Sequence, residues 1–86
     1  MAEFEVRINK AAAKELGRVP KTETRRILRR IDGLRRDPRP AGSEKLAGRD
    51  AYRIRQGDYR IIYTIDSHRI IVEVIRVGHR SDVYRN

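Results

Sequence analysis

The dipeptide Gly57-Asp58 constrains the fold more than any other feature of this sequence. It separates two segments, 51–56 and 59–65, that are rich in Tyr, Ile and other residues favoured in β-strands. A Gly-X dipeptide between two such segments predicts a two-residue antiparallel hairpin. The turn also sets the register, because it makes Gln56 the partner of Tyr59 and, further along, Tyr52 the partner of Tyr63.

The register divides the side chains of this hairpin between two faces. One face is predicted to carry side chains that helices can cover: Tyr52, Ile54, Ile61 and Tyr63. The opposite face, which we call the arginine face, is predicted to carry Arg53, Arg55 and Arg60. Like charges on directly opposed strand residues destabilise a sheet by up to about 1 kcal/mol, so packing does not explain these arginines. We interpret the arginine face as an anion-binding surface; the alternative is that each guanidinium only extends into water.

The N-terminal half of the chain predicts one strand followed by two helices. Residues 4–9 alternate between apolar and polar, which indicates a half-buried strand. Residues 10–16 predict a short helix with Asn9 as its N-cap. A second helix is expected over residues 20–37, since Asp37 precedes a proline and apolar residues recur at helical spacing, namely Ile27, Leu28, Ile31 and Leu34.

The C-terminal half predicts a loop and three strands. Residues 38–50 are rich in Pro and Gly, and loops of this length are often functional. The strands are expected over residues 51–56, 59–65 and 69–77. The predicted fold is α+β with the order β-α-α-β-β-β, in one domain spanning residues 1–86. Two N-terminal antiparallel helices are expected to pack on one face of a four-stranded antiparallel sheet.

The net positive charge of the chain indicates which class of molecule it binds. The chain has 21 Lys and Arg against 12 Asp and Glu, which gives a formal net charge of +9, and all but four of the basic residues are arginines. A guanidinium binds phosphate with two hydrogen bonds and stacks on bases through its plane. We therefore expect a nucleic-acid partner. A genome that favours arginine codons would also raise the arginine content, but it would scatter the arginines without regard to strand face.

Other features exclude several classes of protein. The absence of cysteine excludes disulfides and thiolate metal sites. No apolar stretch approaches the roughly 18 residues of a membrane span, so no membrane partner is expected. The N-terminus does not resemble a signal peptide, and a cytoplasmic location is expected. His68 and His79 are the only histidines and do not cluster with carboxylates, so neither a metal nor a cofactor is expected.

The segment after the last predicted strand adds further candidate site residues. Gly78 predicts a bend, and it is followed by His79, Arg80, Tyr84 and Arg85. Together with the arginine face, these residues suit metal-independent cleavage of RNA, in which a 2′-hydroxyl attacks the adjacent phosphate. That reaction needs a base for the hydroxyl, positive charge at the phosphoryl oxygens and an acid for the leaving 5′-oxygen. Arginines supply the charge, an aromatic ring can stack on a base, and His or Tyr can exchange protons.

Two strings in the sequence resemble the RelE/ParE superfamily of toxins from prokaryotic toxin–antitoxin modules. Residues 52–63 resemble the central hairpin of that superfamily, and residues 77–85 resemble the C-terminus of its RelE branch. The similarity extends over nearly the whole chain. It implies a type II toxin that enters the A site of the 70S ribosome, cleaves mRNA there, and is silenced by a cognate acidic antitoxin of the RelB kind.

The resemblance also implies roles for individual residues. Arg53 and Arg55 match basic residues that approach the scissile phosphate, and Arg60 matches the arginine of the return strand. Arg80 matches a phosphate-contacting arginine that can donate a proton, and Tyr84 matches a tyrosine that stacks on the substrate and orients the 2′-hydroxyl. Some relatives carry lysine where this sequence has Arg53 and Arg55, and arginine cannot serve as a base. The base is then Tyr84, His79 or a group on the ribosome.

Two other functions are compatible with the sequence. One is a ParE-like inhibitor of DNA gyrase, which has the same fold and no cleavage chemistry. The presence of both Arg80 and Tyr84 favours the ribonuclease reading over this one. The other is a non-catalytic nucleic-acid-binding relative, or an inactive toxin that serves only as a partner for an antitoxin.

Overall fold

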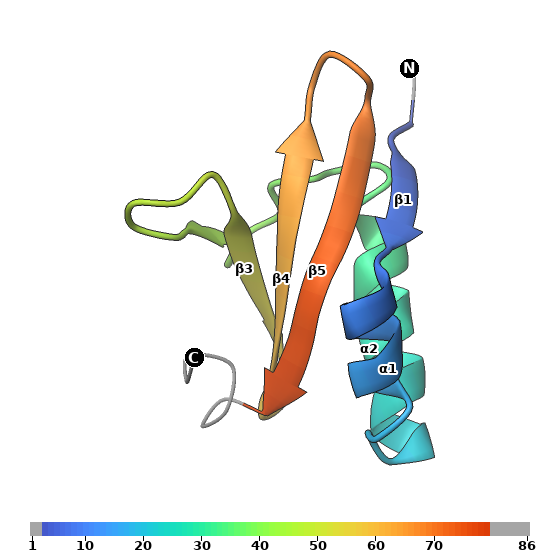
Figure 1. The fold of residues 1–86 in the computed structure, drawn as a ribbon. Helices are drawn as coiled ribbons and strands as arrows, with labels where there is room; N and C mark the ends of the chain where they lie inside the picture. The colour runs from blue at the N-terminus through green and yellow to red at the C-terminus, as the bar shows by residue number, and fades with distance from the viewer. Residues whose placement is uncertain (1–2, 80–86) are drawn as a thin grey trace.

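The computed structural model describes residues 3–79 and shows two helices packed against one face of a five-stranded sheet (Figure 1). The elements in chain order are β1 (Glu5–Ile8), α1 (Lys10–Leu16), α2 (Lys21–Gly33), β2 (Glu44–Lys45), β3 (Tyr52–Gln56), β4 (Tyr59–Asp66) and β5 (Ile71–His79). The strand order across the sheet is β1-β5-β4-β3-β2. Neither helix in the described part of the chain is long and apolar enough to cross a membrane.

Two features of the sheet correct the expected four antiparallel strands. β1 pairs with β5 in parallel, and the short strand β2 adds a fifth strand at the other edge. The parallel pairing follows from the path of the chain. α1 continues in the direction of β1 and α2 returns the chain, so β3 and β5 run the same way as β1 (Figure 1). β4 and the short β2 run in the opposite direction. β2 has two residues, too few to produce an alternating pattern in the sequence.

The β3–β4 hairpin has the predicted register. Gln56 pairs with Tyr59, and the pairing continues without interruption to Tyr52 and Tyr63. Gly57 has a positive φ of 60°, which glycine adopts at the first central position of a tight hairpin turn. The turn signal in the sequence thus fixes the pairing of the two central strands.

Both helices form for local reasons that the sequence displays. The side chain of Asn9 accepts a hydrogen bond from the backbone N–H of Ala12 at 2.8 Å and caps α1. α2 ends at Gly33, earlier than expected, because the chain tightens into turns over residues 34–36 before the Asp37-Pro38 dipeptide. Leu28 was expected in the apolar stripe of α2 but is 42% exposed.

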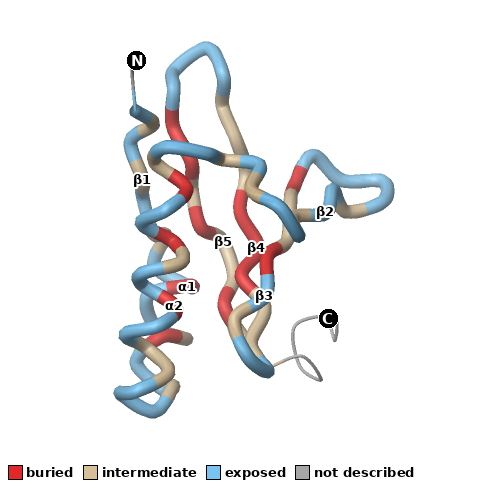
Figure 2. The backbone as a smooth tube through the Cα atoms, turned by 180° about the vertical axis from the view of Figure 1, so that it is seen from behind, coloured by how far each residue is buried: buried red, intermediate tan, exposed pale blue. Residues whose placement is uncertain are grey.

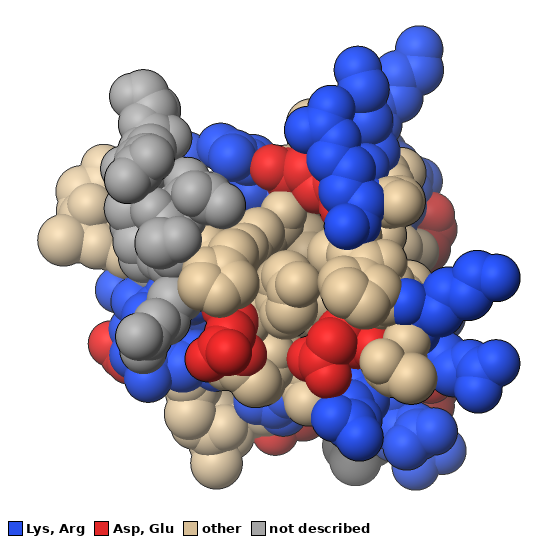
Figure 3. All heavy atoms as spheres, turned by 90° about the horizontal axis from the view of Figure 1, so that it is seen from below, with Lys and Arg blue, Asp and Glu red and all other residues tan. Residues whose placement is uncertain are grey.

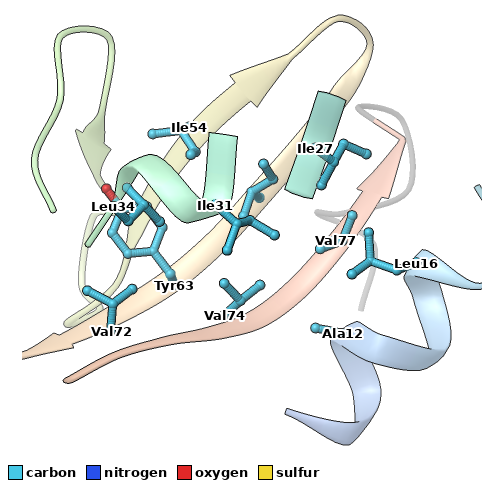
Figure 4. Packing of buried hydrophobic residues seen from close by; sticks show 11 residues of the cluster. Ala12, Leu16, Ile27, Ile31, Leu34, Ile54, Tyr63, Val72, Val74 and Val77 are labelled. Atoms are coloured by element: carbon cyan, nitrogen blue, oxygen red, sulfur yellow. The ribbon is translucent and has the colours of Figure 1, made fainter. Parts of the chain in front are cut away.

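The main core lies between the two helices and the sheet (Figures 2 and 4). Ile27, Ile31 and Leu34 from α2 are buried against Ile54 of β3 and Tyr63 of β4. Burial of each such aliphatic side chain stabilises the fold by about 1.5–3 kcal/mol. A second, smaller cluster joins Ala51 and Ile62 to partly buried apolar side chains, those of Leu46 and Ile75.

The segment between α2 and β3 is attached to the central strands by two tyrosines. The hydroxyl of Tyr63 donates a hydrogen bond to the carbonyl of Pro38 at 2.7 Å. The guanidinium of Arg39 donates to the hydroxyl of Tyr52 at 3.2 Å and lies over its ring, 5.2 Å from the centroid. Since Tyr52 and Tyr63 also stack on each other, these contacts fix the start of the segment that carries β2.

Candidate nucleic-acid interface

The hairpin places the three predicted arginines on the face of the sheet that the helices do not cover. Arg53 and Arg55 alternate with the buried Ile54 along β3, and Arg60 precedes the buried Ile61 on β4. Arg55 and Arg60 are direct cross-strand partners. Three guanidinium groups thus belong to one face of two adjacent strands, and such a cluster attracts phosphate.

The three arginines differ in their environment, which the sequence did not reveal. Arg55 is exposed. The Nε and Nη1 atoms of Arg60 are buried, so this cation has a partly dehydrated environment. Charged hydrogen-bonding groups are more effective where water is excluded. A cleft of about 50 Å³ lies at the tip of the hairpin and is lined by Arg55, Gly57, Asp58, Tyr59 and Arg60.

Arg53 is held by a carboxylate that sequence reasoning did not identify. Its Nη2 atom lies 2.6 Å from Oε1 of Glu44, and the two residues are cross-strand partners of β3 and β2. The Arg53 side chain is only 15% exposed, whereas the Glu44 side chain is 62% exposed. The alternative in which every guanidinium extends into water therefore does not describe Arg53. No sequence signal marks Glu44, because β2 is too short to show strand periodicity.

His79 lies on the other face of the sheet. It pairs with Tyr59, and the two rings meet edge to face with centroids 5.8 Å apart. His79 and Tyr59 line a cleft of about 420 Å³ on the helix side, together with Glu15, Arg18, Val19, Val77 and Gly78. The structure therefore does not bring the imidazole to the arginine face.

The end of β5 is held in place by α1. Glu15 of α1 accepts two hydrogen bonds from this part of β5. The backbone N–H of Val77 donates to Oε1 of Glu15 at 2.7 Å, and Nε of Arg76 donates to Oε2 of Glu15 at 3.1 Å. Gly78 is the cross-strand partner of Arg60. The backbone of Gly78 therefore lies beside Arg60, whereas the ring of the last described residue, His79, lies on the helix side. Arg80, Tyr84 and Arg85 lie outside the described residues.

Comparison with known proteins identifies the family. A family model described as the ParE toxin of the type II toxin–antitoxin system parDE matches residues 6–84. The chain belongs to this toxin family.

Individual relatives support the assignment of the chain to this toxin family. Toxin RelG of Mycobacterium tuberculosis is 33% identical over 86 residues, which cover 95% of this chain and 97% of RelG. The archaeal RelE–RelB complex from Pyrococcus horikoshii contains a chain with a TM-score of 0.83 and 32% identity, covering 94% of this chain and 99% of that one. A chain in the RelBE2 toxin–antitoxin complex of Mycobacterium tuberculosis has a TM-score of 0.81 and 26% identity, covering 91% and 99%. The expected RelE-like α+β fold is confirmed.

Proposed function

We propose that this toxin, as a single domain over residues 1–86, is a metal-independent endoribonuclease that cleaves mRNA in the ribosomal A site and stops translation. The observation that carries the proposal is the arginine face. Arg55 and Arg60 are opposed across the hairpin, and Arg53 is fixed beside them by Glu44. Similarity to toxins named RelE and RelG supports the same function.

The reaction proposed for this face is attack of a 2′-hydroxyl on the neighbouring phosphate. Arg55 and Arg60 would bind the phosphoryl oxygens, whose negative charge grows in the transition state. Arg53 and Arg85 would bind the flanking backbone. Arg80 would contact the scissile phosphate and stabilise the charge that develops on the leaving 5′-oxygen, which takes its proton from water. Tyr84 would stack on a base and orient the hydroxyl.

Glu44 is our candidate for the proton acceptor. Arginine cannot take up the proton of the 2′-hydroxyl, so Arg53 and Arg55 are unsuitable. Glu44 is a carboxylate in contact with Arg53 and is exposed enough to reach a bound RNA. General-base catalysis by such a group typically contributes 10²–10⁴-fold. His79, proposed from the sequence, lies on the face with Tyr59 and is less well placed.

The proposed protein partner is an acidic antitoxin of the RelB kind. The structural neighbours include RelE–RelB complexes, and the net charge of +9 suits an acidic partner. Association driven by charge is fast at low salt and slows as salt increases. We propose that the toxin acts in the cytoplasm, where ribosomes and antitoxin are present.

A translation assay run beside a DNA-supercoiling assay tests the proposed function. Purified toxin should stop protein synthesis on ribosomes and create new mRNA ends within reading frames, and it should leave gyrase activity unchanged. The second candidate function is inhibition of DNA gyrase, which the ParE name of the matching family favours. Unchanged translation together with blocked supercoiling would replace the first proposal with the second.

A further inference from the structure

The outer surface of the two helices carries a second group of cations, remote from the arginine face. Lys10 and Lys14 are four residues apart on α1, and Lys21, Arg25 and Arg29 repeat the same spacing on α2. Residues at this spacing share one side of a helix. On each helix that side is opposite the buried residues, which are Ala12 and Leu16 on α1 and Ile27 and Ile31 on α2. With Arg18 in the connection between the helices, these six residues form what we call the helical basic face.

The two stripes belong to one surface. α1 and α2 lie side by side over the same face of the sheet (Figures 1 and 2). In the view from below, Lys and Arg side chains project outward on the side of the molecule that the helices occupy (Figure 3). All six residues are exposed.

These cations are not neutralised within residues 3–79. None of the six side chains makes an ion pair or a side-chain hydrogen bond there. The carboxylates of the helices are engaged elsewhere: Glu15 contacts Arg76, Glu23 contacts Arg26, and Asp32 contacts Arg35. The outward stripes therefore keep their full positive charge.

The placement of these cations opposes helix stability. Like charges four residues apart repel each other on a helix. Lys10 and Lys21 are the first residues of α1 and α2, where the helix dipole disfavours a positive charge. Folding alone would favour neutral or acidic residues at these positions. This arrangement indicates a surface that binds an anionic partner.

The composition of the face favours RNA over a protein partner. Protein interfaces are depleted in lysine and centre on buried aromatic or apolar anchors. Three of the four lysines of the chain lie here, and Leu28, 42% exposed, is the only large exposed apolar side chain on the described helices. Phosphate backbones need only positive charges spaced along a surface.

We propose that the helical basic face binds the phosphate backbone of folded RNA and thereby docks the toxin on ribosomal RNA, while the arginine face acts on the messenger. This inference rests on the proposed function for the identity of the RNA. Under this proposal, the helices bind the ribosome and determine the affinity of the toxin for it. The β3–β4 hairpin contacts the mRNA that is cleaved.

A pair of charge-matched double variants tests the proposal. Arg25→Gln with Arg29→Gln removes two cations of the helical basic face. Arg26→Gln with Arg35→Gln removes one cation of α2 and one of the turn that follows it, which are paired with Glu23 and Asp32. The first probe is a blunt RNA duplex of about 16 base pairs, the length that a double-stranded-RNA-binding domain spans. The first double variant should bind the duplex about tenfold more weakly, and the slope of log affinity against log salt should decrease by about 2, whereas the control should change little.

The second probe is a programmed ribosome. The Arg25/Arg29 variant should raise the ribosome concentration for half-maximal cleavage by about tenfold and keep the single-turnover rate at saturation within about twofold. If the toxin cuts no RNA at all, the proposed function fails, yet the duplex measurement still tests this face. Thermal unfolding should show that the Arg25/Arg29 variant is at least as stable as the native chain, because repulsion between like charges is removed.

Two results would overturn the proposal. Equal duplex affinity for the two double variants would mean that the face does not bind RNA. Weaker binding of the acidic antitoxin by the Arg25/Arg29 variant, with unchanged binding of duplex RNA, would assign the face to the protein partner.

Discussion

Arg55 and Arg60 are direct cross-strand partners beside the turn of the β3–β4 hairpin, and one of them is exposed while the other has buried guanidinium atoms. Opposed cations destabilise a hairpin unless an anion compensates them. The pair is therefore suited to a phosphate, with the Arg60 guanidinium partly buried and Arg55 exposed to solvent.

Replacement of the phosphate-binding arginines should slow cleavage strongly. Arg60→Ala and Arg80→Ala should each reduce the single-turnover cleavage rate on ribosomes by about 10²–10³, or roughly 3–4 kcal/mol, because each removes charge that matters most in the transition state. Arg29→Ala, measured at saturating ribosomes, is the control, since this residue lies on α2 and on the other side of the sheet, where it contributes to ribosome affinity and not to the rate at saturation. A loss in Arg29→Ala as large as that in Arg80→Ala, with both variants folded, would show that the site is misplaced.

Two substitutions distinguish the role of the Tyr84 ring from the role of its hydroxyl. Tyr84→Phe keeps stacking on a base, and Tyr84→Ala removes both functions. We expect a large loss of cleavage rate in the alanine variant and a smaller loss in the phenylalanine variant, measured in single turnover at saturating ribosomes. Equal losses would instead make the hydroxyl part of the proton transfer.

Glu44→Gln should slow cleavage by about 10²–10⁴, because the amide cannot accept the proton of the 2′-hydroxyl. Asp50→Asn is the matched control, because it changes another exposed carboxylate of the same segment. His79→Ala should keep both the rate and its pH dependence, since His79 lies on the face with Tyr59. An unchanged rate in Glu44→Gln with tighter RNA binding would show that Glu44 only competes with phosphate for Arg53.

Tyr63 should make stability fall at high pH. Burial raises the pKa of the Tyr63 hydroxyl from 10.0 to about 12. Between these values the folded state keeps a proton that the unfolded state has released, so the free energy of unfolding decreases as the pH rises from about 10 to about 12. The decrease should be roughly 2–3 kcal/mol.

Denaturant unfolding of Tyr63→Phe at several pH values measures this contribution. At neutral pH the variant should lose about 1 kcal/mol, because the hydrogen bond to the Pro38 carbonyl is absent. Its stability should then fall less above pH 10 than that of the native chain. Tyr59→Phe is the control, and an equal pH dependence in both variants would contradict the assignment to Tyr63.

Ile70 is held in an unfavourable backbone conformation. Its φ is 58°, in the left-handed region that β-branched residues rarely adopt, and its side chain is partly exposed. Ile70→Asn should raise the free energy of unfolding by about 0.5–1 kcal/mol, because asparagine tolerates this region and little apolar contact is lost. Leu28→Asn, at a similarly exposed helical position, should instead lower stability, and a loss in both variants would contradict the strain at Ile70.

Features that depend on neighbouring residues could be predicted from the sequence. The Gly57-Asp58 turn fixed the register of β3 and β4, and therefore the face that carries Arg53, Arg55 and Arg60. In the same way, Asn9 marked the start of α1, and the spacing of apolar residues identified α2. A turn, a cap or a helical stripe is encoded within a few residues, so its signal can be read directly.

Contacts between distant segments could not be predicted from the sequence and became evident in the folded structure. The parallel pairing of β1 with β5 joins residues more than sixty positions apart, and it depends on how both helices return the chain. The pairing of Glu44 with Arg53 depends on a two-residue strand with no periodic pattern of its own. The separation of His79 from the arginine face, and the burial of Arg60, follow from how β5 packs beside β4, which no local stretch of sequence encodes.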